Sequence, residues 1–138
     1  MNVLIDTPIW SLALRRTRRT SRQQALVDEL TELIREMRAE IIGPIRQEVL
    51  SGIPGEEHFR SVQKRLRPFD DVAIDSSDYE EAAALYNLCR GRGIQGSHTD
   101  FLICAVAIRH SLSVFTVDRD FTHYARHTGV QLHEPRRG

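Results

Sequence analysis

The sequence predicts an α/β fold, a three-layer α/β/α sandwich around a central parallel sheet of four or five strands. Short apolar runs alternate along its 138 residues with longer stretches in which apolar residues recur every three or four positions. Parallel strands require crossover connections, and helices usually supply these and cover both faces of the sheet. The sequence contains no linker and no internal repeat, so we expect a single domain over residues 1–138.

The N-terminal half supplies two strands of the expected sheet. The run Asn2 to Asp6 (NVLID) predicts the first strand, and Thr7-Pro8 then opens a helix, because proline is tolerated in a first turn. Ser21 and Gln24 form a capping box pattern. The remaining expected elements are a helix from about Arg22 to Arg38, a strand at Glu40 to Pro44, and helices from about Ile45 to Gly52 and from His58 to Arg67.

The C-terminal half continues the alternation. Asp71 to Asp75 (DVAID) predicts a third strand, and a capping box pattern at Ser77 and Glu80 predicts a helix to about Arg92. The apolar run Phe101 to Ile108, inside residues 98–110, fits a buried strand or a buried helix, and its alanines and length favour the helix. The last elements are a strand at Ser113 to Val117, a helix at Arg119 to His127, and a fifth strand candidate at Val130 to Leu132.

Composition excludes several classes of protein. Nineteen basic residues balance 19 acidic ones, and no apolar run approaches the roughly 20 residues of a membrane span. Asp6 falls where a signal peptide would carry its apolar region. Cys89 and Cys104 form no CxxC pair, which favours free thiols over a disulfide or a zinc site. We therefore expect a cytoplasmic protein without a membrane partner.

Four acidic residues follow expected strands or open expected helices: Asp6, Glu48, Asp100 and Asp118. In open parallel sheets, ligands collect outside the carboxyl ends of the strands, so these carboxylates are candidates for one shared site. Carboxylates packed together repel one another, and a cation or a shared proton relieves that repulsion. Oxygen ligands alone favour a hard ion such as Mg²⁺ or Mn²⁺.

Each acid also has a simpler interpretation. Asp100 suits the positive end of a helix dipole, Asp118 suits a helix N-cap, and Glu48 on a helix is by default solvated. Asp6 is harder to explain in this way, because aspartate is depleted in strands and Asp6 directly follows NVLI. The hypothesis of a metal site therefore depends on the four acids together.

These residues lie in segments that together resemble the PIN domain nucleases, and among them the VapC toxins of bacterial VapBC toxin-antitoxin pairs. The resemblance spans the whole chain. Its segments are LIDT at Leu4 to Thr7, IRQEVLSG at Ile45 to Gly52, HTDFLICAVA at His98 to Ala107, and TVDRDF at Thr116 to Phe121. The order and spacing of the four segments are more specific than any one of them.

The resemblance implies a metal-dependent endoribonuclease that leaves a 3′-hydroxyl and a 5′-phosphate. It implies that Asp6, Glu48, Asp100 and Asp118 bind Mg²⁺ or Mn²⁺, and that Asp6 and Asp100 are the most direct ligands. Thr7 and Thr116 match hydroxyl positions that help to orient the cluster, and Asp120 matches an auxiliary acid that simple capping also explains. It further implies a VapB-type antitoxin as partner, RNA as substrate and a homodimer. Cys104 departs from the usual alanine-like residue without affecting the inferred activity.

The basic residues are concentrated near the N-terminus. Arg15, Arg16, Arg18, Arg19 and Arg22 lie within eight residues of one another. The first four of them either form a solvated loop or line the acidic cleft and bind RNA phosphates.

Other candidate sites are less persuasive. His123 and His127 stand four residues apart but lack an HExxH motif, so an exposed helix face is the simpler interpretation. Trp10 could stack on a base, although its position beside Ile9 and Leu12 favours the core. The glycines at 91, 93 and 96 form GxGxxG after a helix rather than after a strand, which argues against a dinucleotide site.

Three rival functions remain open. A phosphoacceptor domain resembling the receiver domains would need a second acid beside Asp6 and a lysine after the last strand, whereas the only lysine is Lys64. A non-catalytic RNA- or partner-binding module would retain the acids without turnover. A housekeeping RNA-processing nuclease would share the chemistry but not the toxin role.

Overall fold

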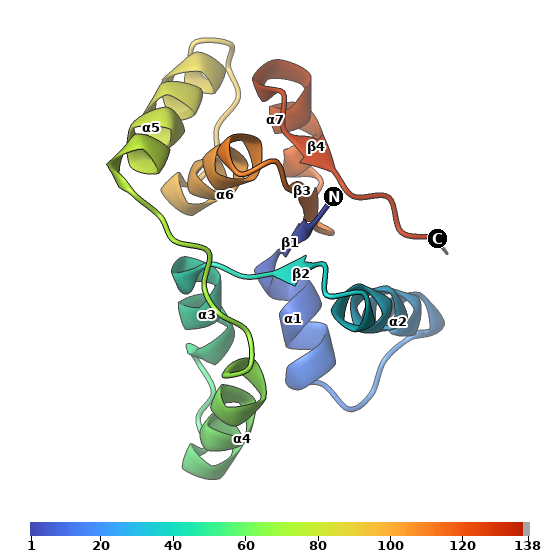
Figure 1. Ribbon diagram of the computed structural model, residues 1–138. Coiled ribbons are helices and arrows are strands. Elements are labelled where there is room, and N and C mark those ends of the chain that lie inside the picture. Colours follow the sequence, from blue (N-terminus) through green and yellow to red (C-terminus); the bar gives the residue numbers. More distant parts are fainter. Residues whose placement is uncertain (137–138) are drawn as a thin grey trace.

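A four-stranded parallel sheet lies between two groups of helices, with α5 and α6 on one side and α2 on the other (Figure 1). The computed structural model describes residues 1–136 of the chain. The strands are β1 (Val3–Ile5), β2 (Ala39–Glu40), β3 (Ser113–Phe115) and β4 (Gln131–Leu132). The helices are α1 (Thr7–Leu14), α2 (Ser21–Arg35), α3 (Gly43–Leu50), α4 (Glu56–Leu66), α5 (Ser76–Arg90), α6 (His98–Arg109) and α7 (Asp120–Thr128). The predicted α/β sandwich is confirmed, with four strands in the sheet.

The strand order β2-β1-β3-β4 makes β1 and β3 the central pair. From β1 the chain moves outward to β2, and it then returns to the other side of β1 as β3 and continues to β4. Ile5 pairs with Phe115 in parallel register, and the Asp6 amide donates to the Phe115 carbonyl over 2.9 Å. The carboxyl ends of β1 and β3 therefore meet at the point where the strand order changes direction, which is where open α/β sheets bind ligands.

The core surrounds these two strands and α6. All residues of β1 and β3 are buried, and so is the α6 segment 101–107, which settles this apolar run as a helix. A helix that is apolar on all sides must be covered on all sides. Contacts with α5, α7 and β3 provide that cover. Trp10 is buried as expected, and Cys89 and Cys104 are buried free thiols.

The predicted strand at Asp71 to Asp75 is wrong. Its only pairing is an isolated parallel bridge between Asp71 and Ile41, because β2 ends just before this bridge and α3 begins two residues after Ile41. The Asp71 side chain accepts a hydrogen bond from Arg46 over 3.0 Å. Asp75 is already the N-cap of α5. The neighbouring strand β2 is thus too short to form a ladder of hydrogen bonds with residues 71–75. Asp71 and Asp75, at the two ends of this segment, form other polar contacts instead.

Both predicted capping boxes are displaced from their true positions. The box of α2 is formed by Thr20 and Gln23, and the box of α5 by Asp75 and Asp78. Several residues in each segment have a suitable side chain, and the cap falls to the one whose backbone is extended. The α2 helix also ends at Arg35 rather than Arg38, because Met37 adopts a left-handed conformation with φ of 58°.

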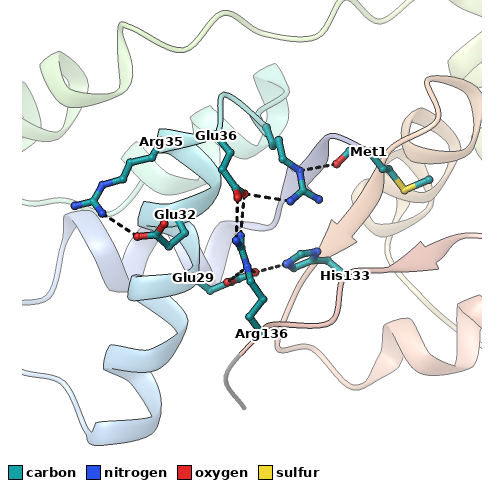
Figure 2. Close-up of polar contacts among 8 residues, drawn as sticks. Met1, Glu29, Glu32, Arg35, Glu36, His133 and Arg136 are labelled. Atoms are coloured by element: carbon teal, nitrogen blue, oxygen red, sulfur yellow. Dashed lines mark hydrogen bonds and ion pairs between the residues drawn. The ribbon is translucent and has the colours of Figure 1, made fainter.

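The segment that follows β4 docks on α2 (Figure 2). Buried Glu29 accepts from His133 Nε2 over 2.6 Å and from Arg136 Nε over 3.1 Å. Arg136 also forms a two-pronged ion pair with Glu36 at the end of α2, with both N–O distances at 2.9 Å. These contacts join the C-terminal part of the described chain to a helix more than 100 positions earlier in the sequence.

Within residues 1–136, no helix combines the length and the apolar character needed to cross a bilayer.

Candidate active site

Asp6 lies at the carboxyl end of β1 and caps α1. Its Oδ1 accepts from the Thr7 backbone amide over 2.8 Å, and its Oδ2 accepts from the Thr116 hydroxyl over 2.7 Å. The strand ends here because the side chain satisfies the first free amide of the helix, and Pro8 in the next position needs no partner. Two elements, α1 and the turn after β3, thus hold one carboxylate at the switch point of the sheet.

The pKa of Asp6 is raised above its ordinary value. Burial is the main cause, because it penalises the charged form, and the hydrogen bonds from Thr116 and Thr7 offset part of this effect. The negative charges of Asp100 and Glu48 raise the pKa further. The charges of Asp100 and Glu48 thus both act on Asp6, although the three acids come from three different parts of the fold.

Asp6 differs from the other buried acids of the chain. Asp6 is 7% exposed, Glu29 is 5% exposed and Asp78 is 1% exposed. Glu29 pairs with His133 and Arg136, and Asp78 pairs with an arginine and a histidine at the end of α6. Asp6 forms no ion pair within residues 1–136. A buried carboxylate without a basic partner is the signature of a site that a cation neutralises.

Asp100 lies in the first turn of α6 and is half-buried. Its backbone amide donates to the Ser97 side chain at the N-cap over 3.0 Å. Its Oδ2 accepts from the Tyr124 hydroxyl over 2.7 Å, and Tyr124 comes from α7. The predicted helix-terminus position is therefore confirmed, but the carboxylate also has a specific tertiary partner that a dipole effect alone does not require.

The pKa of Asp100 is also raised. Burial is the largest cause, and the hydrogen bonds from Tyr124 and Ser97 act in the opposite direction. The charges of Asp118 and Asp120 raise the pKa further. Asp100 thus links the acids that follow β3 to Asp6 and Glu48, which joins all the predicted acidic site residues into one electrostatic group.

Glu48 enters this group from α3. Its Oε2 accepts from the Thr7 hydroxyl over 3.2 Å, so Thr7 contacts Asp6 through its amide and Glu48 through its side chain. Glu48 is exposed, in agreement with the solvated interpretation, but its position is fixed by α1. The predicted orienting role of Thr7 therefore corresponds to a direct contact with two acids.

The turn after β3 carries Thr116 and Asp118, and Asp120 is the first residue of α7. Thr116 donates to Asp6 and accepts from the Asp118 amide over 3.0 Å. Asp118 Oδ1 in turn accepts from the Asp120 amide over 2.9 Å, although the N-cap of α7 is Arg119 and not Asp118 as the sequence suggested. This contact occupies one oxygen of Asp118.

The group consists entirely of carboxylate and hydroxyl oxygens, which are ligands for Mg²⁺ or Mn²⁺ rather than for zinc or copper. Over the described part of the chain, no three His, Cys, Asp or Glu side chains are arranged to hold a metal ion as they stand. The chemistry of the donor set still fits a hard cation. Buried Asp6 and half-buried Asp100 have pKa values raised by neighbouring acids, and positive charge would relieve that repulsion.

The arginine segment lies at the other end of α1 from Asp6, roughly 12 Å away at 1.5 Å per helical residue. Arg16 and Arg18 are exposed and Arg15 is half-buried. Arg19 instead donates to the carbonyls of Leu12, Ala13 and Arg16 and to the Gln24 side chain. Arg19 therefore closes the end of α1, whereas the other three guanidinium groups have no such role.

Sequence reasoning missed Tyr124, the hydroxyl partner of Asp100. A signal was present, because Tyr124 follows Phe121 by three residues and so shares the apolar face of its helix. A buried tyrosine hydroxyl usually has a hydrogen-bond partner, so this position indicates such a partner for Tyr124. The sequence cannot identify that partner, because Asp100 lies 24 positions away. His123 is exposed as expected, and His127 contacts Arg92.

Comparison with known proteins gives a consistent family relationship. The PIN domain family model matches residues 3–127. Ribonuclease VapC11 of Mycobacterium tuberculosis is 31% identical over 133 residues, which cover 94% of this chain and 96% of that protein. VapC ribonuclease Mb1587 of Mycobacterium bovis matches with the same identity and the same coverage.

Solved structures share the fold over nearly the whole chain. FitAcB from Neisseria gonorrhoeae superposes with a TM-score of 0.78 at 21% identity and covers 99% of both chains. VapBC2 from Rickettsia felis, bound to a DNA fragment from its promoter, gives a TM-score of 0.72 at 15% identity and covers 96% of this chain and 98% of that chain.

Proposed function

This chain belongs to the PIN domain family, and from that membership we propose that it is an endoribonuclease that requires Mg²⁺ or Mn²⁺ and acts as the toxin of a type II toxin-antitoxin system. The observation that carries the proposal is the buried carboxylate of Asp6, which repels two neighbouring acids and forms no ion pair within residues 1–136. The relatives at 31% identity are named ribonucleases, which supports RNA as the substrate. The whole chain, residues 1–138, acts as one domain in this proposal.

The proposed ligands are Asp6, Glu48, Asp100 and Asp118. Asp6 and Asp100 are the principal ones, because burial and mutual repulsion give them the strongest need for a counter-charge. Thr7 and Thr116 orient the cluster through their contacts with Asp6 and Glu48. Asp120 has an auxiliary role, since its charge acts on Asp100 while its own side chain is exposed.

A divalent ion held by these acids would acidify a water molecule for attack and neutralise charge on the phosphate oxygens. The protein's own contribution is to fix the acids in place. Thr116 holds Oδ2 of Asp6, and the Thr7 amide holds Oδ1, so this carboxylate cannot rotate freely. Preorganised oxygens reduce the reorganisation needed as charge develops, which is a major source of enzymatic rate enhancement. The proposed products carry a 3′-hydroxyl and a 5′-phosphate.

Substrate binding requires positive charge near an acidic centre. We assign this role to Arg15, Arg16 and Arg18, whose guanidinium groups are not committed to closing α1, and a weaker role to Arg19, whose donors hold backbone carbonyls.

A partner must also silence a toxin in the cell that makes it. The Rickettsia felis neighbour is a VapBC complex, which supports a VapB-type antitoxin as partner. A homodimer is the working form that the resemblance to the family implies. We propose a cytoplasmic location, because RNA and such a partner would both be met there.

Asp6→Asn and Asp100→Asn test the proposal, because an amide keeps the shape of the side chain and removes its charge. Each variant should lose Mn²⁺-dependent RNA cleavage by at least about 100-fold and should no longer inhibit growth. The fold should persist, because Asn is also a competent helix cap. Circular dichroism and cleavage of a mixed RNA substrate across millimolar Mn²⁺ are the measurements.

Asp70→Asn is the matched control, because Asp70 is an exposed acid outside the group. This variant should cleave RNA at the wild-type rate. Full-rate cleavage by folded Asp100→Asn would overturn the four-acid site. Wild-type protein that binds RNA but never cleaves it with Mn²⁺ would instead favour the non-catalytic binding module. Loss of cleavage in the variants without any growth inhibition by the wild type would favour a housekeeping RNA-processing nuclease.

A further inference from the structure

We propose that Tyr124 is a positioning residue for Asp100, and that its hydroxyl fixes the direction in which this carboxylate faces the cation. This inference rests on the proposed function and adds a residue to that site. The Tyr124 hydroxyl donates to Asp100 Oδ2 over 2.7 Å. Ser97, at the N-cap of the same helix, also contacts Asp100. Tyr124 thus supplies the hydroxyl that reaches this carboxylate from a different element, α7.

The ring of Tyr124 is locked in place by its neighbours. Tyr124 is 0% exposed, and its ring centroid lies 4.8 Å from that of Phe101 and 5.1 Å from that of Phe121. Phe101 directly follows Asp100 on α6, so the tyrosine packs against the same turn that it hydrogen-bonds. A donor on a ring that cannot move fixes the direction of its acceptor, as partners of metal ligands commonly do.

Gly96 makes room for this arrangement. A Cβ atom at position 96 would overlap the Tyr124 hydroxyl and would lie 2.8 Å from Tyr124 Cζ and 2.9 Å from Phe101 Cε2. Gly96 does not have a positive φ, so the backbone conformation does not require glycine here. The requirement is the close approach of the tyrosine hydroxyl. Three segments, the loop before α6, α6 itself and α7, thus converge on one hydrogen bond.

A hydroxyl also holds the other principal acid, where the Thr7 amide binds the second oxygen as well. Thr116 donates to Asp6 Oδ2 over 2.7 Å, the same distance at which Tyr124 donates to Asp100 Oδ2. Buried Asp6 and half-buried Asp100 are therefore each held by a neutral hydroxyl rather than by a basic side chain. A hydroxyl orients a carboxylate without neutralising its charge, and the charge remains for a cation. An arginine or lysine in this position would compete with that cation.

Tyr124→Phe removes the hydroxyl and keeps the ring. Metal-free Tyr124→Phe should melt within a few degrees of the wild type, because the packing against Phe101 and Phe121 persists. Its affinity for Mn²⁺, measured from the free-ion signal in electron paramagnetic resonance, should fall by about ten-fold or more, as is typical when a partner of a metal ligand is lost. The Mn²⁺ concentration that gives half-maximal RNA cleavage should rise by the same factor.

Tyr86→Phe is the matched control. The Tyr86 ring also packs against Phe101, with centroids 5.6 Å apart, but its hydroxyl accepts from Arg90 and contacts no acid of the site. This variant should bind Mn²⁺ as the wild type does. Unchanged Mn²⁺ affinity in Tyr124→Phe, with the wild type binding Mn²⁺, would overturn only the positioning role. Wild-type protein that binds no Mn²⁺ would overturn the positioning role together with the metal-dependent function.

Gly96→Ala offers a second test, because its methyl group would displace the Tyr124 hydroxyl without changing the tyrosine. Gly96→Ala should weaken Mn²⁺ binding to a similar degree as Tyr124→Phe. If both substitutions act through one hydrogen bond, the double variant should bind Mn²⁺ no more weakly than whichever single variant binds it less tightly. Additive losses would contradict the shared mechanism.

Discussion

At the scale of single residues, two buried carboxylates have pKa values that are shifted in opposite directions. Burial works to raise the pKa of Asp78, but bonds from the Asp75 amide, His110 and Arg109 more than compensate, and the net pKa is lowered. Burial raises the pKa of Asp6, and the hydroxyl and amide that contact it only offset part of the rise. The charged form of the first acid is stabilised by its partners, whereas the charged form of the second is destabilised by burial.

These opposite shifts predict opposite dependences of stability on pH in the metal-free protein. The raised pKa of Asp6 means that stability is lost as pH rises from the ordinary value of 3.8 through the folded value, and the loss remains at neutral pH. Asp6→Asn should therefore gain stability relative to the wild type over that interval. Denaturant unfolding with chelator across pH 3 to 8 measures the difference. An Asp6→Asn effect that is the same at every pH would mean that Asp6 acts only as a cap.

Asp78 predicts the reverse. Its lowered pKa provides stability that is present above the ordinary value of 3.8 and is lost as pH falls through the folded value. Asp78→Asn should cost about 2 kcal/mol at pH 7, because bonds to charged partners are lost. The cost should shrink toward pH 3 in the same unfolding series. A constant cost would place the effect in packing rather than in charge.

At the scale of elements, the two ends of α1 are held by different kinds of side chain and have different roles. Its N-terminus begins at the Asp6 cap, and its C-terminus is closed by Arg19, whose guanidinium binds the Leu12, Ala13 and Arg16 carbonyls. Cationic side chains suit the C-terminal end of a helix, where carbonyls lack partners. The neighbouring arginines have no such structural task. The segment thus combines a structural arginine with three that we propose bind RNA.

This division predicts separate effects of two variants. Changing Arg15, Arg16 and Arg18 together to Gln should weaken RNA binding and reduce the salt slope by about 2, because roughly three phosphate contacts are lost from a single strand. The free energy of unfolding should stay nearly constant. Binding titrations at several salt concentrations and denaturant unfolding are the two measurements.

Arg19→Gln is the counterpart within the same segment. It should lower the free energy of unfolding by about 2 kcal/mol, because charge-assisted bonds to three carbonyls are lost. It should leave the salt slope of RNA binding close to that of the wild type. An unchanged slope in the triple variant would make residues 15–18 a solvated loop.

At the scale of the whole molecule, the segment after β4 joins the C-terminal part of the described chain to α2. His133 and Arg136 bind the buried Glu29 of α2 (Figure 2). Arg38, near β2, donates to the Met1 carbonyl over 2.9 Å. His133 also extends the β4 pairing, since its amide donates to the Val114 carbonyl over 2.8 Å. These contacts tie α2 and the edge strand β4 to the same sheet.

Loss of a contact between the segment after β4 and Glu29 of α2 should destabilise the fold more than loss of a surface ion pair. His133→Ala should lower the free energy of unfolding by about 2 kcal/mol, because buried Glu29 loses one of its two partners. Arg60→Ala, which breaks an exposed pair with Glu56, should cost less than about 0.5 kcal/mol. Equal costs in denaturant unfolding would show that docking of the C-terminal segment adds nothing to stability.

Local sequence was a good guide to the elements and a poor guide to their ends. The strand at β1, the helix at α6 and the strand at β3 follow from their apolar runs, because burial of these runs is required in any fold that this chain adopts. The predicted strand at residues 71–75 failed because pairing requires a partner, and β2 stops after Glu40. Caps were displaced because neighbouring polar residues compete for them, and only the path of the backbone selects one.

The sequence by itself determined the α/β alternation, the identity of the acids and, through four short segments, the resemblance to the PIN domain nucleases. Only the tertiary structure decided that Asp6, Glu48, Asp100 and Asp118 belong to one electrostatic group, that Asp6 lacks a basic partner within residues 1–136, and that Tyr124 holds Asp100. The physical reason is that composition and periodicity act over a few residues, whereas the pairing of β1 with β3 joins positions 110 apart. A carboxylate's partners depend on that long-range register.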